Sequence, residues 1–242
     1  MGILSFCCAR PSSKAPPSDP SVLFSQAMKL FNQGRLEKAK EAFSRLVGYF
    51  PEERDLVAKA ELKMADCAFL RKEYSEAIER YTEFKKRYPF HPDVPYADFQ
   101  IAMCHFKQMR PKDRDQEPTR EALRAFEEVL QKYPDTIFAE KAHQKIALCK
   151  RRLAEHEIYV GKFYLRKGKY RAAFGRFLSA WQLKGSGKED EALYLLAVVS
   201  QKMGRYEEAL KYLETLKEEF PSSRFVRKAE ALREKLRGKG AS

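Results

Sequence analysis

The stretch EYSEAIERYTEFKKRYP, at residues 73–89, decides the fold because the chain repeats it with small changes. Three further copies end in proline, and a fainter copy, KYRAAFGRFLSAWQLKG, ends in glycine at position 185. In each proline-ended copy the proline follows an alanine by 12 residues. The anchoring alanines, spaced by 36 to 51 residues, are Ala39, Ala77, Ala122, Ala173 and Ala209. Five copies near one period predict a repeat protein.

Each copy reads as the second helix of a helical hairpin, because another amphipathic helical segment precedes it. The first segments carry a small residue at mid-helix, where two helices can approach closely: Ala27, Ala65, Ala102, Gly161 and Ala197. Glycines at positions 34, 168 and 204 are expected to end three of these helices in the left-handed conformation. The proline then ends the second helix. This pattern resembles the tetratricopeptide repeat, so we expect an all-α solenoid of about five tetratricopeptide-like hairpins and about ten helices.

Two irregularities interrupt the pattern. Residues 110–118, RPKDRDQEP, lengthen the third unit and are predicted to form an exposed loop. From 137 to 167 there is no proline and the only glycine is Gly161, which predicts one long helix of about 45 Å. We therefore divide the chain into an N-terminal anchor or tether (1–20), repeats one to three (21–136), the long helix with repeats four and five (137–236), and a disordered tail (237–242).

The charge balance favours acidic partners. The 242 residues carry a formal net charge of +13, which suits an acidic protein, nucleic acid or anionic lipid equally. Residues 150–171 hold eight basic and two acidic residues, so +6 of that charge lies in one short stretch. This stretch is either a solvated helix face or a docking surface.

No catalytic or metal-binding pattern stands out. The segment GSGK, at 185–188, lacks the spacer and the Ser/Thr of a phosphate loop, so we predict a plain turn there. The four histidines do not cluster, and the five cysteines form no CxxC pair. Cys67 and Cys104 are expected to be small core side chains. We predict that the protein is not an enzyme and that it uses no metal or cofactor.

Three motifs carry a closer resemblance to one family. They are the Arg-Asp-Gln-x-Pro loop at 114–118, the Leu-Ala-x-His-Glu run at 153–157, and the segment 172–176. Together with HPDVPYADFQIAM, at 91–103, they are similar to the BamD family over about residues 20–180. BamD proteins are tetratricopeptide lipoproteins of the outer-membrane β-barrel assembly machine.

The resemblance implies a non-catalytic scaffold for the folding and membrane insertion of outer-membrane proteins. Its implied partners are the BamA-type barrel assembly protein, other assembly lipoproteins and unfolded outer-membrane proteins, with no nucleic acid. Its implied location is the periplasmic face of the bacterial outer membrane, through a lipid anchor. The alternative is a tetratricopeptide adaptor in another cytosolic or membrane-associated complex.

The family resemblance also implies a lipidated cysteine near the N-terminus, here Cys7 or Cys8. Phe6 departs from the family signal, which has a small residue at that position, and the segment before Cys7 is shorter than a signal peptide. Three alternatives stay open: an upstream start, a degenerate signal, or an unlipidated protein. N-myristoylation of Gly2 is disfavoured, because that motif requires Ser or Thr where Phe6 stands.

Two sets of residues are candidates for partner contacts. By the family resemblance, Arg176, with Arg166 and Lys169, is expected to contact an acidic patch on the barrel assembly protein. The first helices of the front hairpins carry an apolar stripe that forms either a peptide groove or ordinary core packing. The groove candidates are Phe24, Met28, Phe31, Leu62, Phe69, Phe99, Met103 and Phe106, with Lys107 placed to meet a terminal carboxylate. The implied ligand is the aromatic-ended C-terminus of an outer-membrane protein.

Overall fold

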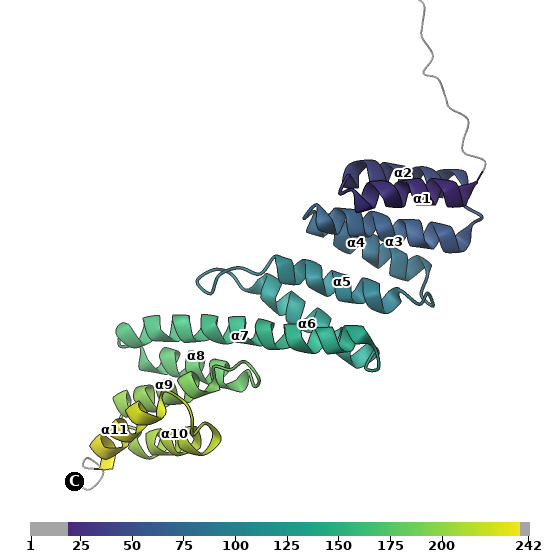
Figure 1. Cartoon of the computed structure of the whole chain (residues 1–242). Helices are drawn as coiled ribbons and strands as arrows, with labels where there is room; N and C mark the ends of the chain where they lie inside the picture. The colour runs from purple at the N-terminus through teal and green to yellow at the C-terminus, as the bar shows by residue number, and fades with distance from the viewer. Residues whose placement is uncertain (1–18, 238–242) are drawn as a thin grey trace, which may run out of the picture. The chain divides into compact units, whose positions relative to one another are not determined.

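The computed structural model describes residues 19–237 and is built from two compact units, Met1–Tyr88 (unit 1) and Pro89–Ser242 (unit 2). All regular elements among the described residues are α-helices (Figure 1). The all-α prediction is therefore confirmed.

Unit 1 contains two helical hairpins. Its helices are α1 (Pro20–Asn32), α2 (Leu36–Tyr49), α3 (Arg54–Leu70) and α4 (Tyr74–Arg87). The second helix of each hairpin ends two residues before a proline of the repeat, at Tyr49 and Arg87. The mid-helix Ala27 and Ala65 are fully buried, as expected for residues where two helices cross.

Unit 2 contains three hairpins and one additional helix. Its helices are α5 (Val94–Lys107), α6 (Glu117–Lys132), α7 (Ile137–Arg166), α8 (Tyr170–Gln182), α9 (Glu189–Lys202), α10 (Tyr206–Glu219) and α11 (Val226–Arg237). The described residues thus form eleven helices, one more than the ten expected from the repeats. Helix α11 was not predicted from the sequence. Its residues Ala229 and Leu236, with Phe225 just before its start, pack into the core of the last hairpin.

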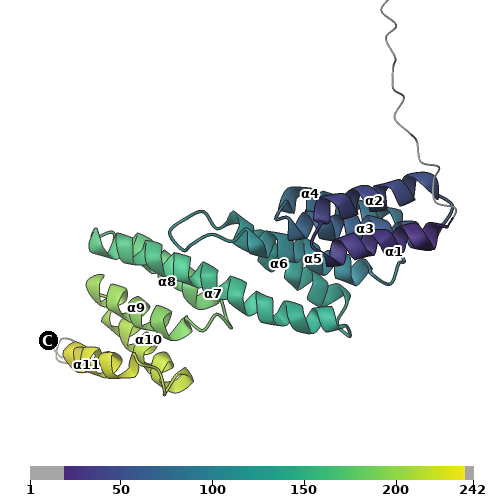
Figure 2. The same cartoon turned by 45° about the horizontal axis from the view of Figure 1, so that its top comes forward.

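The long helix predicted between 137 and 167 is confirmed as α7, which has 30 residues. The hydroxyl of Thr136 caps its start by accepting a hydrogen bond from the backbone N–H of Ala139. The first half of α7 packs into one core with α5 and α6, through Ile146 and Cys149. Its second half packs into another core with α8 and α9, through Ala154 and Ile158. One helix therefore belongs to two neighbouring cores. Figure 2 shows the ribbon of α7 along its length.

The crossing of α7 and α8 requires a residue without a side chain. A Cβ atom added to Gly161 would lie 2.4 Å and 2.7 Å from two ring carbons of Phe177, a side chain with no solvent exposure. Glycine here allows the two backbones to come close, as the sequence analysis expects of this position.

Four of the five hairpin turns in the described part of the chain contain a left-handed residue. Gly34, Gly168 and Gly204 have φ values of +72°, +69° and +75°, which confirms their prediction as helix ends. The second hairpin has Lys72 at this position, with φ of +65°. A lysine there makes the same pattern of backbone hydrogen bonds that glycine makes elsewhere, from residue 73 back to Ala68. This position is strained, because a left-handed conformation crowds the Cβ atom.

None of the helices in the described part of the chain has the length and apolar character that a membrane span requires.

Candidate partner-docking surface

The loop between α5 and α6 is shaped from within by one buried side chain. The amide of Gln116 is almost inaccessible to solvent and donates to the carbonyls of Pro111 and Arg114, at 2.8 Å and 2.9 Å. Its oxygen accepts a hydrogen bond from the buried hydroxyl of Thr119 at 2.9 Å. Residues 110–115 are exposed as predicted, whereas Gln116 is buried and residues 117–118 of the predicted loop form the start of α6. A buried, fully bonded amide of this kind fixes the course of the loop around it.

The same loop is fastened to α7. The guanidinium of Arg152 donates to the carbonyl of Arg110 at 2.9 Å, and Nδ1 of His156 lies 2.7 Å from the carbonyl of Lys112. Because a carbonyl only accepts, His156 must carry its proton on Nδ1 in this contact. The loop that contains the Arg-Asp-Gln-x-Pro motif and the α7 segment that contains the Leu-Ala-x-His-Glu run, about 40 residues apart in the sequence, therefore meet in space through Arg110 and Lys112. Neither motif by itself predicts this contact.

Arg176, the principal docking candidate, already has a carboxylate partner. Its Nη1 lies 3.1 Å from Oε2 of Glu157, which is largely covered on α7. The guanidinium itself is exposed on α8, so it can also face a partner protein. The Arg176–Glu157 pair joins α7 to α8, and any substitution of Arg176 changes this contact as well as the surface.

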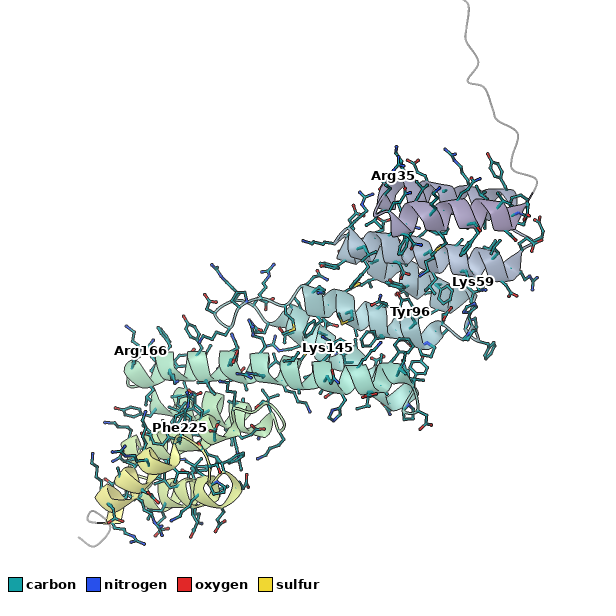
Figure 3. All side chains as sticks on the ribbon, in the orientation of Figure 1. Arg35, Lys59, Tyr96, Lys145, Arg166 and Phe225 are labelled. Carbon is teal, nitrogen blue, oxygen red and sulfur yellow. The ribbon has the colours of Figure 1, made fainter. Side chains whose placement is uncertain are left out.

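The other two candidates lie at the turn between α7 and α8. Arg166 and Lys169 are exposed, and neither forms an ion pair with any residue in the part of the chain that the structure describes. Lys167 and Arg171 beside them are exposed too, so four cations gather at one turn. Figure 3 marks Arg166 at the end of α7 where this turn begins.

The remaining cations of the basic stretch are mostly balanced by carboxylates. Arg151 and Arg152 both lie near Glu155, at 3.3 Å and 3.7 Å, and Lys162 lies 2.6 Å from Glu191 of α9. The excess positive charge of residues 150–171 is therefore concentrated at the α7–α8 turn. Attraction of an acidic partner is strongest at such an unbalanced cluster.

The peptide-groove candidates are divided between the two units. Phe24, Met28 and Phe31 pack against the core of unit 1, where the ring of Phe24 contacts Phe43. Leu62 is nearly fully buried, and Phe69 lies edge-on to Tyr74. These five side chains contribute to packing within unit 1.

The three apolar candidates in unit 2 also pack within their own unit. Phe99 is nearly fully buried, and Met103 and Phe106 pack against the same core. The ring of Phe106 lies edge-on to Phe126. Only Lys107 is exposed. Peptide binding by these residues stays a prediction.

The GSGK segment forms a turn that is satisfied by its own chain. The carboxylate of Glu189 accepts hydrogen bonds from the backbone N–H groups of Gly185, Ser186 and Lys188, at 2.6, 3.1 and 2.8 Å. Glu189 is buried and opens α9. The amides that would cradle a phosphate in a nucleotide-binding loop are thus occupied, in agreement with the prediction of a plain turn.

The three described cysteines are buried, as expected for Cys67 and Cys104. Burial raises the pKa of Cys67 to about 11 and the pKa values of Cys104 and Cys149 to about 12. Their thiols are therefore neutral and unreactive near neutral pH. Cys7 and Cys8, the lipidation candidates, lie outside the described residues.

The helical hairpins and their left-handed turns define a tetratricopeptide-type repeat protein. Its fold is similar to that of a tetratricopeptide repeat protein from Bacteroides fragilis, with a TM-score of 0.53 at 12% identity, covering 92% of this chain and all of the other. The model of the YfiO family, described as outer membrane lipoprotein, matches residues 16–182, and a tetratricopeptide model matches residues 191–223.

The chain belongs to the YfiO family, of which the BamD assembly factors are members. It is 28% identical over 224 residues to the outer membrane protein assembly factor BamD of Rickettsia prowazekii, covering 92% of this chain and 89% of that protein. It is 30% identical over 205 residues to BamD of Caulobacter vibrioides, covering 84% of this chain and 67% of that protein. The family resemblance drawn from the sequence motifs is confirmed.

Proposed function

We propose that this protein is a non-catalytic scaffold of the outer-membrane β-barrel assembly machine. The observation that supports this most strongly is the family match over residues 16–182, which includes the loop and the α7 motif that are joined by Arg152 and His156. In this role the protein binds the BamA-type barrel protein and receives unfolded outer-membrane proteins.

The scaffold function is tested in the native host by placing the gene under a promoter that can be switched off, so that the protein is depleted. Depletion is expected to lower the amount of folded outer-membrane β-barrels and to leave cytosolic proteins unchanged. The tagged full-length protein is expected to co-purify with the barrel assembly protein. Loss of growth without loss of folded barrels, together with co-purification of a cytosolic complex, would instead support the general adaptor.

We assign docking of the barrel protein to the exposed cations of the fourth hairpin, Arg176, Arg166 and Lys169. Exposed charges at the rim of an interface mainly change the association rate and its salt dependence. Arg166→Gln with Lys169→Gln is therefore expected to weaken co-purification at moderate salt and to leave helicity unchanged.

Arg176 needs a matched pair of variants because of its contact with Glu157. Arg176→Gln removes the contact and the surface cation, whereas Glu157→Gln removes the contact and keeps the cation. If Arg176 docks the partner, the first variant loses complex and the second does not. If the two variants recover equal amounts of the complex, Arg176 contributes only to the stability of the hairpin.

The anchor and the peptide groove are separate proposals. A lipid on Cys7 or Cys8 is tested by mass spectrometry of the mature N-terminus, where a free terminus would refute it. Binding of an aromatic-ended peptide is tested by titrating full-length protein and its Lys107→Gln variant. If the parent and the Lys107→Gln variant bind the peptide with equal affinity, or if an alanine-ended peptide binds equally well, the groove candidates serve only in core packing.

A further inference from the structure

The connection between α5 and α6 is longer than the closure of a hairpin requires. The four other hairpins in the described part of the chain have three residues between their helices, such as residues 33–35 between α1 and α2. The third hairpin has nine, residues 108–116. Its additional length therefore needs a reason other than joining two helices.

The loop of residues 110–115 is held through its backbone. Four of its carbonyl oxygens accept a hydrogen bond, at 2.7–2.9 Å, from three side chains that lie outside it: Gln116, Arg152 and His156. Figure 1 shows this loop alongside the second half of α7, the helix that supplies Arg152 and His156. Ordering a loop costs conformational entropy, and these contacts offset that cost.

The charged side chains of the same loop are left to the solvent. Lys112, Asp113 and Arg114 are exposed, and their side chains make no hydrogen bond or ion pair with any residue that the structure describes. Asp115 is also exposed and accepts a hydrogen bond from the backbone N–H of Glu117 at 3.3 Å. The chain thus fixes the backbone of the loop and leaves most of its charges available.

A fixed backbone with free side chains suits recognition of a partner. A loop that is ordered before binding loses less conformational entropy when a partner docks, so the same contacts bind more tightly. Loops that a rigid scaffold positions often carry the residues of a binding site. The extra length and the ties to α7 are both explained if the loop has this task.

The charges of the loop favour a protein as the partner. Arg110, Lys112 and Arg114 are basic, whereas Asp113 and Asp115 are acidic. A nucleic acid or an anionic bilayer would bring phosphates close to these two carboxylates, and like charges repel. A protein surface can place an opposite charge against each residue.

Neighbouring residues of α7 connect the loop with the docking candidate Arg176. His156 holds the loop, and the next residue, Glu157, lies 3.1 Å from the guanidinium of Arg176. The segments that contain the three family motifs are therefore joined at one turn of α7. This connection favours the partner that is proposed to dock at Arg176, the BamA-type barrel protein.

We propose that residues 110–115 are a preformed recognition loop for the BamA-type barrel protein, and that Gln116, Arg152 and His156 position it. The proposal rests on the scaffold function and deepens it, because it adds a contact of mixed charge to the cations of the fourth hairpin. The three positioning residues act through the loop and not by touching the partner.

The positioning role is tested by brief trypsin digestion of the full-length protein without a partner. The bonds after Lys112 and Arg114 are cut only when the loop opens locally. His156→Ala removes one tie and is expected to speed these cuts at least tenfold, about 1.4 kcal/mol. His156→Asn keeps an N–H donor in the place of Nδ1 and is expected to be cut at the parent's rate. Peptide mass spectrometry measures the cuts, and circular dichroism verifies that the variants stay helical.

The recognition role is tested by measuring the affinity of the full-length protein for the purified barrel protein of its own organism. Lys112→Ala with Arg114→Ala removes two charges of the loop and is expected to weaken binding about tenfold. The control, Lys202→Ala with Lys211→Ala, removes two exposed cations of α9 and α10 and is expected to bind like the parent. His156→Ala keeps every charge of the loop and is expected to weaken binding, whereas His156→Asn is expected to bind like the parent.

Three results would overturn the proposal. If trypsin cuts the parent and His156→Ala equally fast, the ties do not hold the loop. If the loop variant binds as tightly as the control, or His156→Ala as tightly as the parent, the loop is only a connection between helices. Both results leave the scaffold function intact. If the parent does not bind the barrel protein, the docking proposed for the scaffold fails, and the loop's proposed partner fails with it.

Discussion

The crossing of α7 and α8 makes a quantitative prediction about Gly161. The methyl group of alanine at this position would come within 2.4 Å of the ring of Phe177, which is fully buried and cannot move into solvent. Gly175, on α8 of the same hairpin, is also helical, but a Cβ atom added there meets nothing within 4 Å. The two glycines therefore differ in steric surroundings and share helical context.

Alanine in place of a helical glycine has two opposing effects on the free energy of unfolding, and each can be estimated separately. Gly→Ala inside a helix stabilises by about 0.5–1 kcal/mol because alanine loses less backbone entropy on folding. Inserting a methyl group into a packed core costs about 1–3 kcal/mol. Gly175→Ala is thus expected to raise the free energy of unfolding by about 0.5–1 kcal/mol. The free energy of unfolding of Gly161→Ala should be lower than that of Gly175→Ala by the steric cost, about 1–3 kcal/mol.

The assay is urea unfolding followed by tryptophan fluorescence. The chain has one tryptophan, Trp181, which packs in the same core as Phe177, so the signal reports on this hairpin. Phe177→Leu combined with Gly161→Ala is expected to recover part of the loss, since a smaller side chain relieves the contact. If both alanine variants are equally stabilised, the close approach of α7 and α8 does not exist as described.

Three further predictions concern the turns and the buried thiols. Lys72→Gly is expected to stabilise unit 1 by about 1 kcal/mol, because glycine has no penalty at positive φ, and Gly34→Ala should destabilise it by a similar amount; opposite signs in thermal unfolding verify this, and equal signs contradict it. Glu189→Gln should destabilise unit 2 by about 1–3 kcal/mol, since three backbone amides lose a charged acceptor; an unchanged urea midpoint would show that the amides find other partners. The described thiols, whose pKa values are raised to about 11–12 by burial, should resist iodoacetamide at pH 8 and react after unfolding, as mapped by peptide mass spectrometry; modification of folded protein would contradict their burial.

The repeat pattern predicted most of the fold because each helix and turn depends on nearby residues. The crossing alanines, the glycine turns and the proline ends each report a local requirement, and the structure meets all of them. Lys72 escaped prediction since lysine gives no signal for positive φ. The helix α11 escaped it because a single amphipathic segment outside the repeat period resembles many surface helices.

The contacts between hairpins could not be predicted in the same way. Arg152 reaches a carbonyl 42 residues away, and Arg176 pairs with a carboxylate 19 residues away. Which of several basic residues makes such a contact depends on the angle between helices, and one sequence does not supply that angle. The groove candidates met the same difficulty, because an apolar stripe facing the core and one facing a ligand have the same period.

The sharing of α7 between two cores changes how unit 2 can come apart. In an ordinary repeat array each unit can open by breaking one interface, and stability is a sum of units and interfaces. Here the boundary between the third and fourth hairpins is a continuous helix, so opening either neighbour leaves α7 with an apolar face in water. Partial opening is therefore costly, and slow hydrogen exchange should extend without a break through the middle of α7, with residues 146–158 exchanging as one cooperative block.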